Sequence, residues 1–149
     1  MELTWILARL EELTPSQVHD LFRLRVDTFV VEQRCAYPEL DGRDPDCTHL
    51  LAMDPDGRLV ACGRIVPPAD DGMPHLGRIV VHPAMRGHGI AHELMRKALE
   101  AVGAIYGHTR CALAAQSQLE AFYAEHGFVR SGPDYDWDGI PHVDMIRER

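Results

Sequence analysis

The feature that most constrains the fold of this chain is a glycine-rich turn between an apolar segment and an amphipathic one. The turn, residues 86–91, reads Arg-Gly-His-Gly-Ile-Ala and follows the β-branched run 79–81. After the turn, apolar residues recur at helical spacing as far as about Tyr106. The backbone N–H groups that open such a helix, together with the positive end of its dipole, attract an anion. The pattern predicts a strand, a tight turn and a helix that bind a ligand with phosphate groups.

Individual residues of the turn suit this interpretation. Gly87 is able to take a positive φ, and Gly89 lets a ligand approach the backbone without a Cβ in the way. Arg86 adds positive charge beside the phosphates. Glycines also occur at ordinary strand-to-helix turns, so the motif alone leaves a purely structural role open.

Two motifs together resemble those of a known family. The Arg-x-x-Gly-x-Ala motif at residues 86–91 resembles the acetyl-CoA signature of the GCN5-related N-acetyltransferases, the GNAT family. A second apolar segment, residues 111–115, leads to Phe-Tyr-x-x-x-Gly-Phe at residues 122–128, which is also typical of that family. A closer resemblance, to the ElaA-type subgroup, extends over residues 24–33, 35–42, 76–81 and 138–145.

The resemblance implies an α/β (α+β) fold in one domain, residues 1–149. Its sheet is mixed and mostly antiparallel, flanked by helices, and its central parallel strands, ending at Val81 and Ala115, splay apart. The local patterns agree, because Thr14-Pro15 and Gln17 predict a helix start and Asp54–Gly57 a hairpin turn. The expected strands are 4–10, 48–53, 58–66, 75–81, 109–115, 128–131 and 142–146, and the expected helices are 15–31, 90–106 and 117–126.

The resemblance also implies how acetyl-CoA binds. Splayed strands leave backbone groups unpaired, which is costly unless a ligand satisfies them. We therefore expect the pantetheine arm along residues 79–81, with the N–H of Val80 polarising the thioester, and the diphosphate on the turn, where His88 contributes its backbone. The expected cofactor-binding residues are Ile79, Val80, Val81, Arg86, Gly87, His88, Gly89, Ile90, Ala91, Gln116 and Tyr123.

Acyl transfer to an amine needs a proton donor and a proton acceptor. The CoA thiolate leaves with a pKa near about 8.5, so a tyrosine close to the sulfur is a suitable acid. Tyr123 matches the family's tyrosine, although its spacing with Leu119 and Phe122 also fits a core aromatic residue.

The amine itself must lose a proton, because an alkylammonium with a pKa near about 10.4 is almost fully charged at pH 7. Residues 78–81 lack the glutamate that several family members place on the equivalent strand. The candidate bases are Glu32, Glu39, His75 and His142, and histidine is the residue type that most often serves as a base near neutral pH.

Four carboxylates, Glu32, Glu39, Asp41 and Asp44, lie close together in the sequence. They form either a solvated loop or an acidic entrance that attracts an amine. We expect Glu39, Asp41 and His75 to contact the acceptor, which would then be a small amine, a polyamine or a lysine side chain.

Composition excludes several other classes. A net charge of −8 argues against a nucleic-acid surface, and the chain has neither a long apolar run nor a secretory signal, so we expect a cytoplasmic protein without a membrane partner. Four cysteines without a Cys-x-x-Cys pair indicate reduced thiols. No histidine or cysteine cluster has zinc spacing, so no metal is expected.

Two functions remain. The first is an acetyl-CoA-dependent N-acetyltransferase in which the amine attacks directly in a ternary complex. The second is an acetyl-CoA-binding sensor or interaction module without catalysis. The sequence is compatible with a homodimer in either case.

Overall fold

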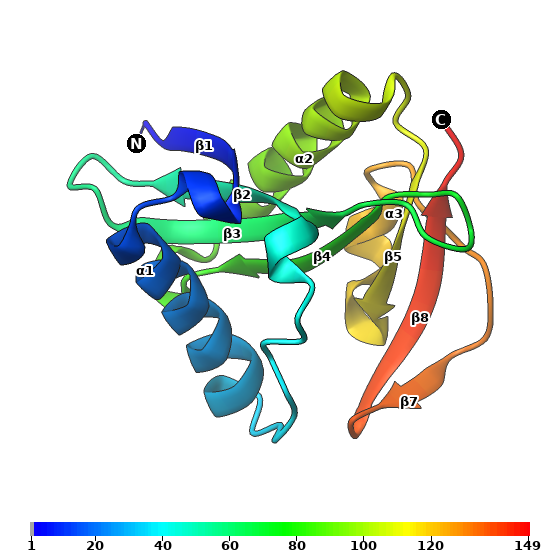
Figure 1. Cartoon of the computed structure of the whole chain (residues 1–149). Helices are drawn as coiled ribbons and strands as arrows, with labels where there is room; N and C mark the ends of the chain where they lie inside the picture. The colour runs from blue at the N-terminus through cyan, green and yellow to red at the C-terminus, as the bar shows by residue number, and fades with distance from the viewer. Residues whose placement is uncertain (1) are drawn as a thin grey trace.

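The computed structural model describes residues 2–149 as a sheet of eight strands with three α-helices (Figure 1). The strand order is β1-β2-β3-β4-β5-β8-β6, and β7 pairs with β8. Every pair is antiparallel except β4 with β5, so the predicted mixed sheet is confirmed. The strands are β1 Thr4–Arg9, β2 Thr48–Met53, β3 Leu59–Val66, β4 His75–Val81, β5 Cys111–Gln116, β6 Val129–Arg130, β7 Tyr135–Trp137 and β8 Ile140–Arg147.

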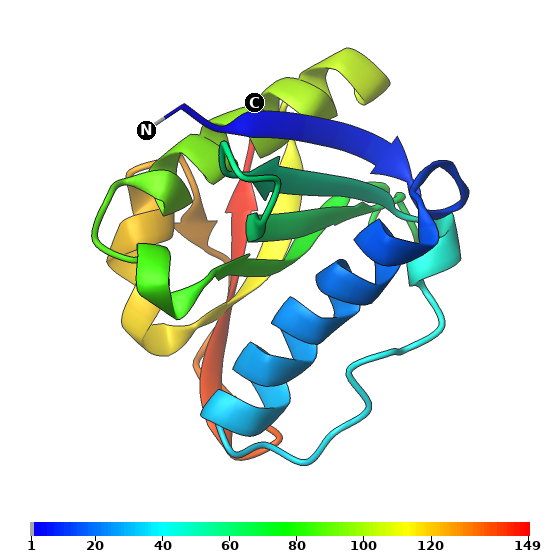
Figure 2. The same ribbon diagram turned by 90° about the vertical axis from the view of Figure 1, so that its left-hand side faces the viewer.

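Helices cover both faces of this sheet. Figures 1 and 2 show α1 (Pro15–Val26) on one face of the β1–β4 half and α2 (Ile90–Tyr106) on the other. The short α3 (Glu120–Ala124) packs against β5 and β6. One apolar core joins α2 to the sheet and includes Tyr123, and a second joins Leu21 and Leu24 of α1 to Val80. Short 3-10 turns cover Leu10–Glu12, Asp44–Asp46, Pro83–Met85 and Ser117–Leu119.

The first helix begins as its sequence predicts and ends differently. The N-cap Thr14 accepts a hydrogen bond from the Gln17 N–H at 3.1 Å, and the Gln17 side chain accepts one from Thr14 at 2.9 Å. After Val26 the chain continues as a π-helix over Asp27–Glu32. A wider helical turn of this kind is rare and rotates the residues that follow it. Here it brings Phe29 into the lining of the main pocket.

The other differences from the predicted elements lie near the C-terminus. The expected helix 117–126 is split into a 3-10 turn and α3, and the expected strand 109–115 begins at Cys111. The strand β7 was not predicted. All three of its residues are exposed, so it carries no alternation of buried and exposed positions that the sequence would reveal.

The splay of the central strands forms the site. The strands β4 and β5 pair only at His75–Ala112 and Leu76–Leu113, and then diverge. Next to the divergence β4 bulges against β3, and Arg78 has a φ of +51°. A Cβ at Gly63 of β3 would lie 2.7 Å from Cδ1 of Ile79, so a side chain at residue 63 would require the end of Ile79 to shift.

Candidate active site

The glycine-rich turn has the geometry of an anion site. Gly87 and Gly89 have φ values of +85° and +75°, and Gly89 is the N-cap of α2. No side chain caps this helix, so its first N–H groups are available to a ligand. A Cβ built on either glycine would meet nothing within 4 Å, which shows that the turn is open to an incoming group.

Arg86 lies at the rim of this turn and is held by two partners. Its guanidinium donates to both carboxylate oxygens of Glu32, at 2.7 and 2.9 Å, and its Nε donates to the Val81 carbonyl at 3.1 Å. The hydrogen bonds from Arg86 lower the pKa of Glu32. Glu32 does not line the main pocket, so its position suits a partner of Arg86 and not a base. His88 stays within the loop, with Nδ1 at 3.1 Å from the carbonyl oxygens of Met85 and Arg86.

The backbone N–H and C=O groups of successive β4 residues point alternately toward β3 and toward the splay. The His82 N–H donates to Val60 of β3 at 2.7 Å, whereas the Val81 carbonyl points away from β3 and accepts from Arg86. Because alternate residues face one neighbour, the paired Val80 also directs its N–H to β3. This differs from the expectation that Val80 polarises a thioester. Val81 instead presents its backbone to the splay.

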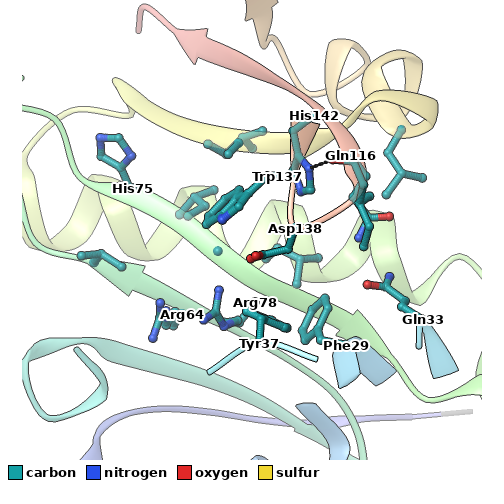
Figure 3. A pocket seen from close by; sticks show the side chains of 18 of the residues that line it. Phe29, Gln33, Tyr37, Arg64, His75, Arg78, Gln116, Trp137, Asp138 and His142 are labelled. Carbon is teal, nitrogen blue, oxygen red and sulfur yellow. Dashed lines mark hydrogen bonds between the residues drawn. The ribbon is translucent and has the colours of Figure 1, made fainter. Parts of the chain in front are cut away.

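A pocket of about 210 Å³ lies beside the splay of β4 and β5 (Figure 3). Its walls come from β4, β5, Tyr123, the loop after α1 and the turn between β7 and β8. It brings together five residues that the sequence predicted for the site, and their side chains or backbone line it: Ile79, Gln116, Tyr123, His75 and His142. His75 is paired with Asp71 at 2.5 Å at the outer end of β4.

Tyr123 is both a core residue and a wall of the pocket. Its ring packs edge-on against Phe122 and Phe128, with centroids 5.0 and 6.3 Å away, and only 7% of the residue is exposed. Burial raises the pKa of its hydroxyl to about 12. The phenol therefore keeps its proton at neutral pH, as a proton donor must.

His142 has one ring nitrogen engaged. Its Nδ1 lies 2.7 Å from the carbonyl oxygen of Ile140, which is able only to accept a hydrogen bond. In the neutral ring Nδ1 therefore carries the hydrogen and Nε2 the lone pair. Aromatic rings hold the imidazole from two sides, with the Trp137 centroid at 5.1 Å and that of Tyr135 at 6.1 Å. This arrangement leaves Nε2 as a proton acceptor in the pocket wall.

All four carboxylates of the predicted acidic cluster pair with arginines, and two of them, Glu39 and Asp44, are buried. Glu39 and Asp44 are each only 3% exposed, and Arg25 donates to both carboxylates at 2.7 Å. Burial by itself raises the pKa of Asp44, but the hydrogen bonds and charges of Arg25 and Arg64 outweigh it and lower that pKa. The network contains three arginines and three carboxylates: Arg25, Arg64 and Arg78 with Glu39, Asp41 and Asp44.

The consequence is that the pocket lacks the acidic entrance expected from the sequence. Neither Glu39 nor Asp41 belongs to its lining, whereas Arg43, Arg64 and Arg78 do. The sequence did not reveal this pairing because the partners are far apart along the chain. Arg64, 23 residues after Asp41, donates to its carboxylate at 2.6 Å. The residues that sequence reasoning missed are Tyr37, Arg43, Arg78, Trp137 and Asp138.

The described residues contain neither a metal-binding cluster nor a membrane-spanning helix. Within residues 2–149 no group of three or more His, Cys, Asp or Glu side chains is arranged to hold a metal ion. Over the same residues, no helix has the length and apolar character needed to cross a membrane.

The turn, the splay and the pocket are those of an acyltransferase fold, and comparisons with known proteins agree. The model of the acetyltransferase (GNAT) domain matches residues 11–149. The chain therefore belongs to the GNAT acetyltransferase family, and the family resemblance predicted from its motifs is confirmed.

Particular relatives are similar over almost their whole length. Protein ElaA of Escherichia coli is 41% identical over 140 residues, which cover 92% of this chain and 91% of ElaA. The crystal structure of Escherichia coli ElaA covers 99% of this chain and 100% of its own, with a TM-score of 0.91 and 37% identity. An acyl-CoA N-acyltransferase from Pseudomonas aeruginosa gives a TM-score of 0.92 at 40% identity, covering 98% of this chain and 99% of that structure.

Proposed function

We propose that this protein is an acetyl-CoA-dependent N-acetyltransferase that transfers an acetyl group to a primary amine by direct attack in a ternary complex. The acceptor is a small amine, a polyamine or a lysine side chain. The observation that carries the proposal is the splay, which joins the open phosphate turn to a pocket lined by both Tyr123 and His142. Family membership supports acyl transfer as the reaction class.

In the proposed reaction, each part of the site has a separate role. The N–H groups of residues 87–91 bind the diphosphate, with Arg86 beside them, and the splay-facing backbone of β4 bonds to the pantetheine amides. Backbone N–H groups on that side of β4 also stabilise negative charge on the thioester oxygen. Nε2 of His142 takes a proton from the amine as it attacks the carbonyl carbon, and Tyr123 donates its proton to the departing sulfur.

Kinetics with His142→Gln tests the base. We expect kcat at pH 7 to fall by about 10² to 10⁴. The deficit shrinks as the pH approaches the pKa of the acceptor, because more of the amine is then already neutral. His19→Gln, at an exposed position outside the pocket, is the matched control. An equal deficit at every pH would assign His142 a structural role.

The kinetic pattern tests the order of events. Direct attack predicts initial-rate lines that intersect when acetyl-CoA and acceptor are varied, whereas a covalent intermediate on a pocket residue such as Cys35 predicts parallel lines. Tight binding of acetyl-CoA without thiol release, across amines, polyamines and lysine peptides, would instead favour a sensor.

A further inference from the structure

The acceptor side of the pocket has opposite charges on different walls. Asp138 comes from the turn between β7 and β8 and forms neither an ion pair nor a hydrogen bond through its carboxylate within residues 2–149. Figure 3 shows this carboxylate pointing into the pocket, toward the side that holds Arg78. Arg78 comes from β4, and Arg43 from the loop after α1.

Each of these arginines has N–H groups to spare. Arg78 uses Nε and Nη2 to bond Glu39, at 2.7 and 3.0 Å, and its guanidinium lies 5.6 Å from the centre of the Tyr37 ring. Its Nη1 bonds nothing within residues 2–149, and the side chain is 13% exposed. Unlike Arg78, which pairs with Glu39 and Asp41, Arg43 is exposed and its guanidinium has no partner in that range.

Asp138 pairs with neither arginine within residues 2–149, and an anion and cations placed in this way along one pocket suit a ligand that carries both charges. An ammonium group would meet Asp138 beside the Trp137 ring, where cation–π attraction adds to the ion pair. A carboxylate would meet Arg78 Nη1 and Arg43, which supply charge-assisted hydrogen bonds. A polyamine would place its second ammonium against these arginines, which is unfavourable.

We infer that the acceptor is an amine that also bears a carboxylate, with the class of an amino acid, held by Asp138 at its nitrogen and by Arg43 and Arg78 at its carboxylate. This inference rests on the proposed function and narrows its acceptor. His142 lies on the same hairpin as Asp138 and lines the same pocket, so the amine held by Asp138 is within the region from which Nε2 removes its proton.

The test compares acids with their amides, with kcat/KM expressed per concentration of neutral amine, because converting a nearby carboxylate to an amide lowers the pKa of the amine. Thiol release is measured with glycine, β-alanine, 4-aminobutyrate and 6-aminohexanoate, each beside its primary amide, and with L-amino acids beside their amides. For at least one chain length we expect kcat/KM for the acid to exceed that for the amide by about tenfold or more, the usual worth of a charge-assisted hydrogen bond. Equal values for every pair would overturn the inference.

Two variants test which residue contacts the carboxylate of the acceptor and which contacts its amine. Arg43→Gln should lower the acid-to-amide ratio of kcat/KM by about tenfold, with Arg58→Gln, another exposed arginine outside this pocket, as control. Asp138→Asn keeps the side-chain shape at a residue with a φ of +51°, which asparagine tolerates. It should lower kcat/KM for acids and amides alike, with Asp56→Asn as control. A ratio insensitive to Arg43→Gln, or rates insensitive to Asp138→Asn, would contradict the corresponding contact.

A binding measurement separates this inference from the proposed function. Saturation-transfer NMR on the protein with CoA present reports acceptor binding without turnover. Amino acids that bind through Asp138 and Arg43 but are never acetylated would refute the transferase while keeping the site. Acetylation of amines without preference for a carboxylate would keep the transferase and refute the site. The site would also be refuted if no amino acid binds and carboxylate-bearing amines are not preferred as acceptors.

Discussion

At the scale of single residues, the proposed mechanism depends on two side chains whose surroundings differ. Tyr123 is surrounded by aromatic rings and keeps its proton, because burial raises its pKa to about 12. His142 has one nitrogen bonded to a carbonyl group, and the other has no partner within residues 2–149. An acid that stays protonated and a base with an available lone pair are what acyl transfer to an amine requires.

Tyr123→Phe removes only the hydroxyl. We expect kcat to fall by about 10- to 10³-fold while the Kd of acetyl-CoA stays the same, since the lost interaction is made in the transition state. The free energy of unfolding should change little, because this hydroxyl has no hydrogen-bond partner among residues 2–149. Kinetics and calorimetry on the same preparation measure both quantities, and an unchanged kcat would make Tyr123 a core residue alone.

Glu32→Gln separates a partner of Arg86 from a catalytic base. The carboxylate of Glu32 competes with the diphosphate for Arg86, and exposed ion pairs of this kind contribute about 0–1 kcal/mol. We therefore expect acetyl-CoA to bind up to about fivefold more tightly, with kcat unchanged. Glu100→Gln, exposed on α2, is the control. A fall in kcat of tenfold or more would restore Glu32 as the base.

At the scale of elements, the arginine–carboxylate network fixes the loop between α1 and β2 against the sheet. Arg25 of α1 is 1% exposed and bonds Glu39 and Asp44, while Arg78 of β4 bonds the same Glu39. Tyr37 also donates its hydroxyl to Glu39. The loop that supplies Tyr37 and Arg43 to the pocket is thereby held by buried ion pairs.

Arg25→Met tests the stabilising role of this network. Removing the cation leaves two buried carboxylates without their common partner, which costs about 3–5 kcal/mol of unfolding free energy. Arg23→Met is the matched control, because Arg23 lies on the same helix, is largely exposed and, in the part of the chain that the structure describes, pairs only with Asp27. Urea denaturation measures both variants. A loss below about 1 kcal/mol for Arg25→Met would show that the loop is held by other contacts.

Local elements were predictable from the sequence, and long-range pairing was not. The Thr14 cap and the turn before α2 depend on residues a few positions apart, so a short stretch of sequence is enough to predict them. The pairing of Arg25 and Arg78 with Glu39 joins positions 14 and 39 residues apart, and only the folded sheet brings them together. That pairing is why the acidic cluster was interpreted as an entrance. Trp137 was missed because it belongs to an exposed strand, and Asp138 because it lies in the turn that follows this strand.

At the scale of the whole molecule, the splay divides the structure into two functional sides. Residues 86–91 lie between the end of β4 and the first turn of α2 (Figure 1). The pocket is lined by residues of β4, β5 and the β7–β8 hairpin (Figure 3). Separate apolar cores on the two faces of the sheet hold β4 in place beside α1 and α2. A ligand with a diphosphate at one end and a thioester at the other fits this division.

The measurement that tests the central claim most directly is acceptor-dependent thiol release from acetyl-CoA by the native protein, by Gly89→Glu and by Gly57→Glu. Both glycines have a similar positive φ, +75° and +80°, with nothing near a new Cβ, so both variants carry the same strain and the same added charge. Only Gly89 lies in the turn at the start of α2.

We predict thiol release by the native protein and by Gly57→Glu, and a fall of about tenfold or more in affinity for acetyl-CoA in Gly89→Glu, because a carboxylate then faces the diphosphate. Equal activity in the two variants would contradict the assignment of this turn to acetyl-CoA. An absence of thiol release from the native protein with every acceptor would contradict the transferase itself.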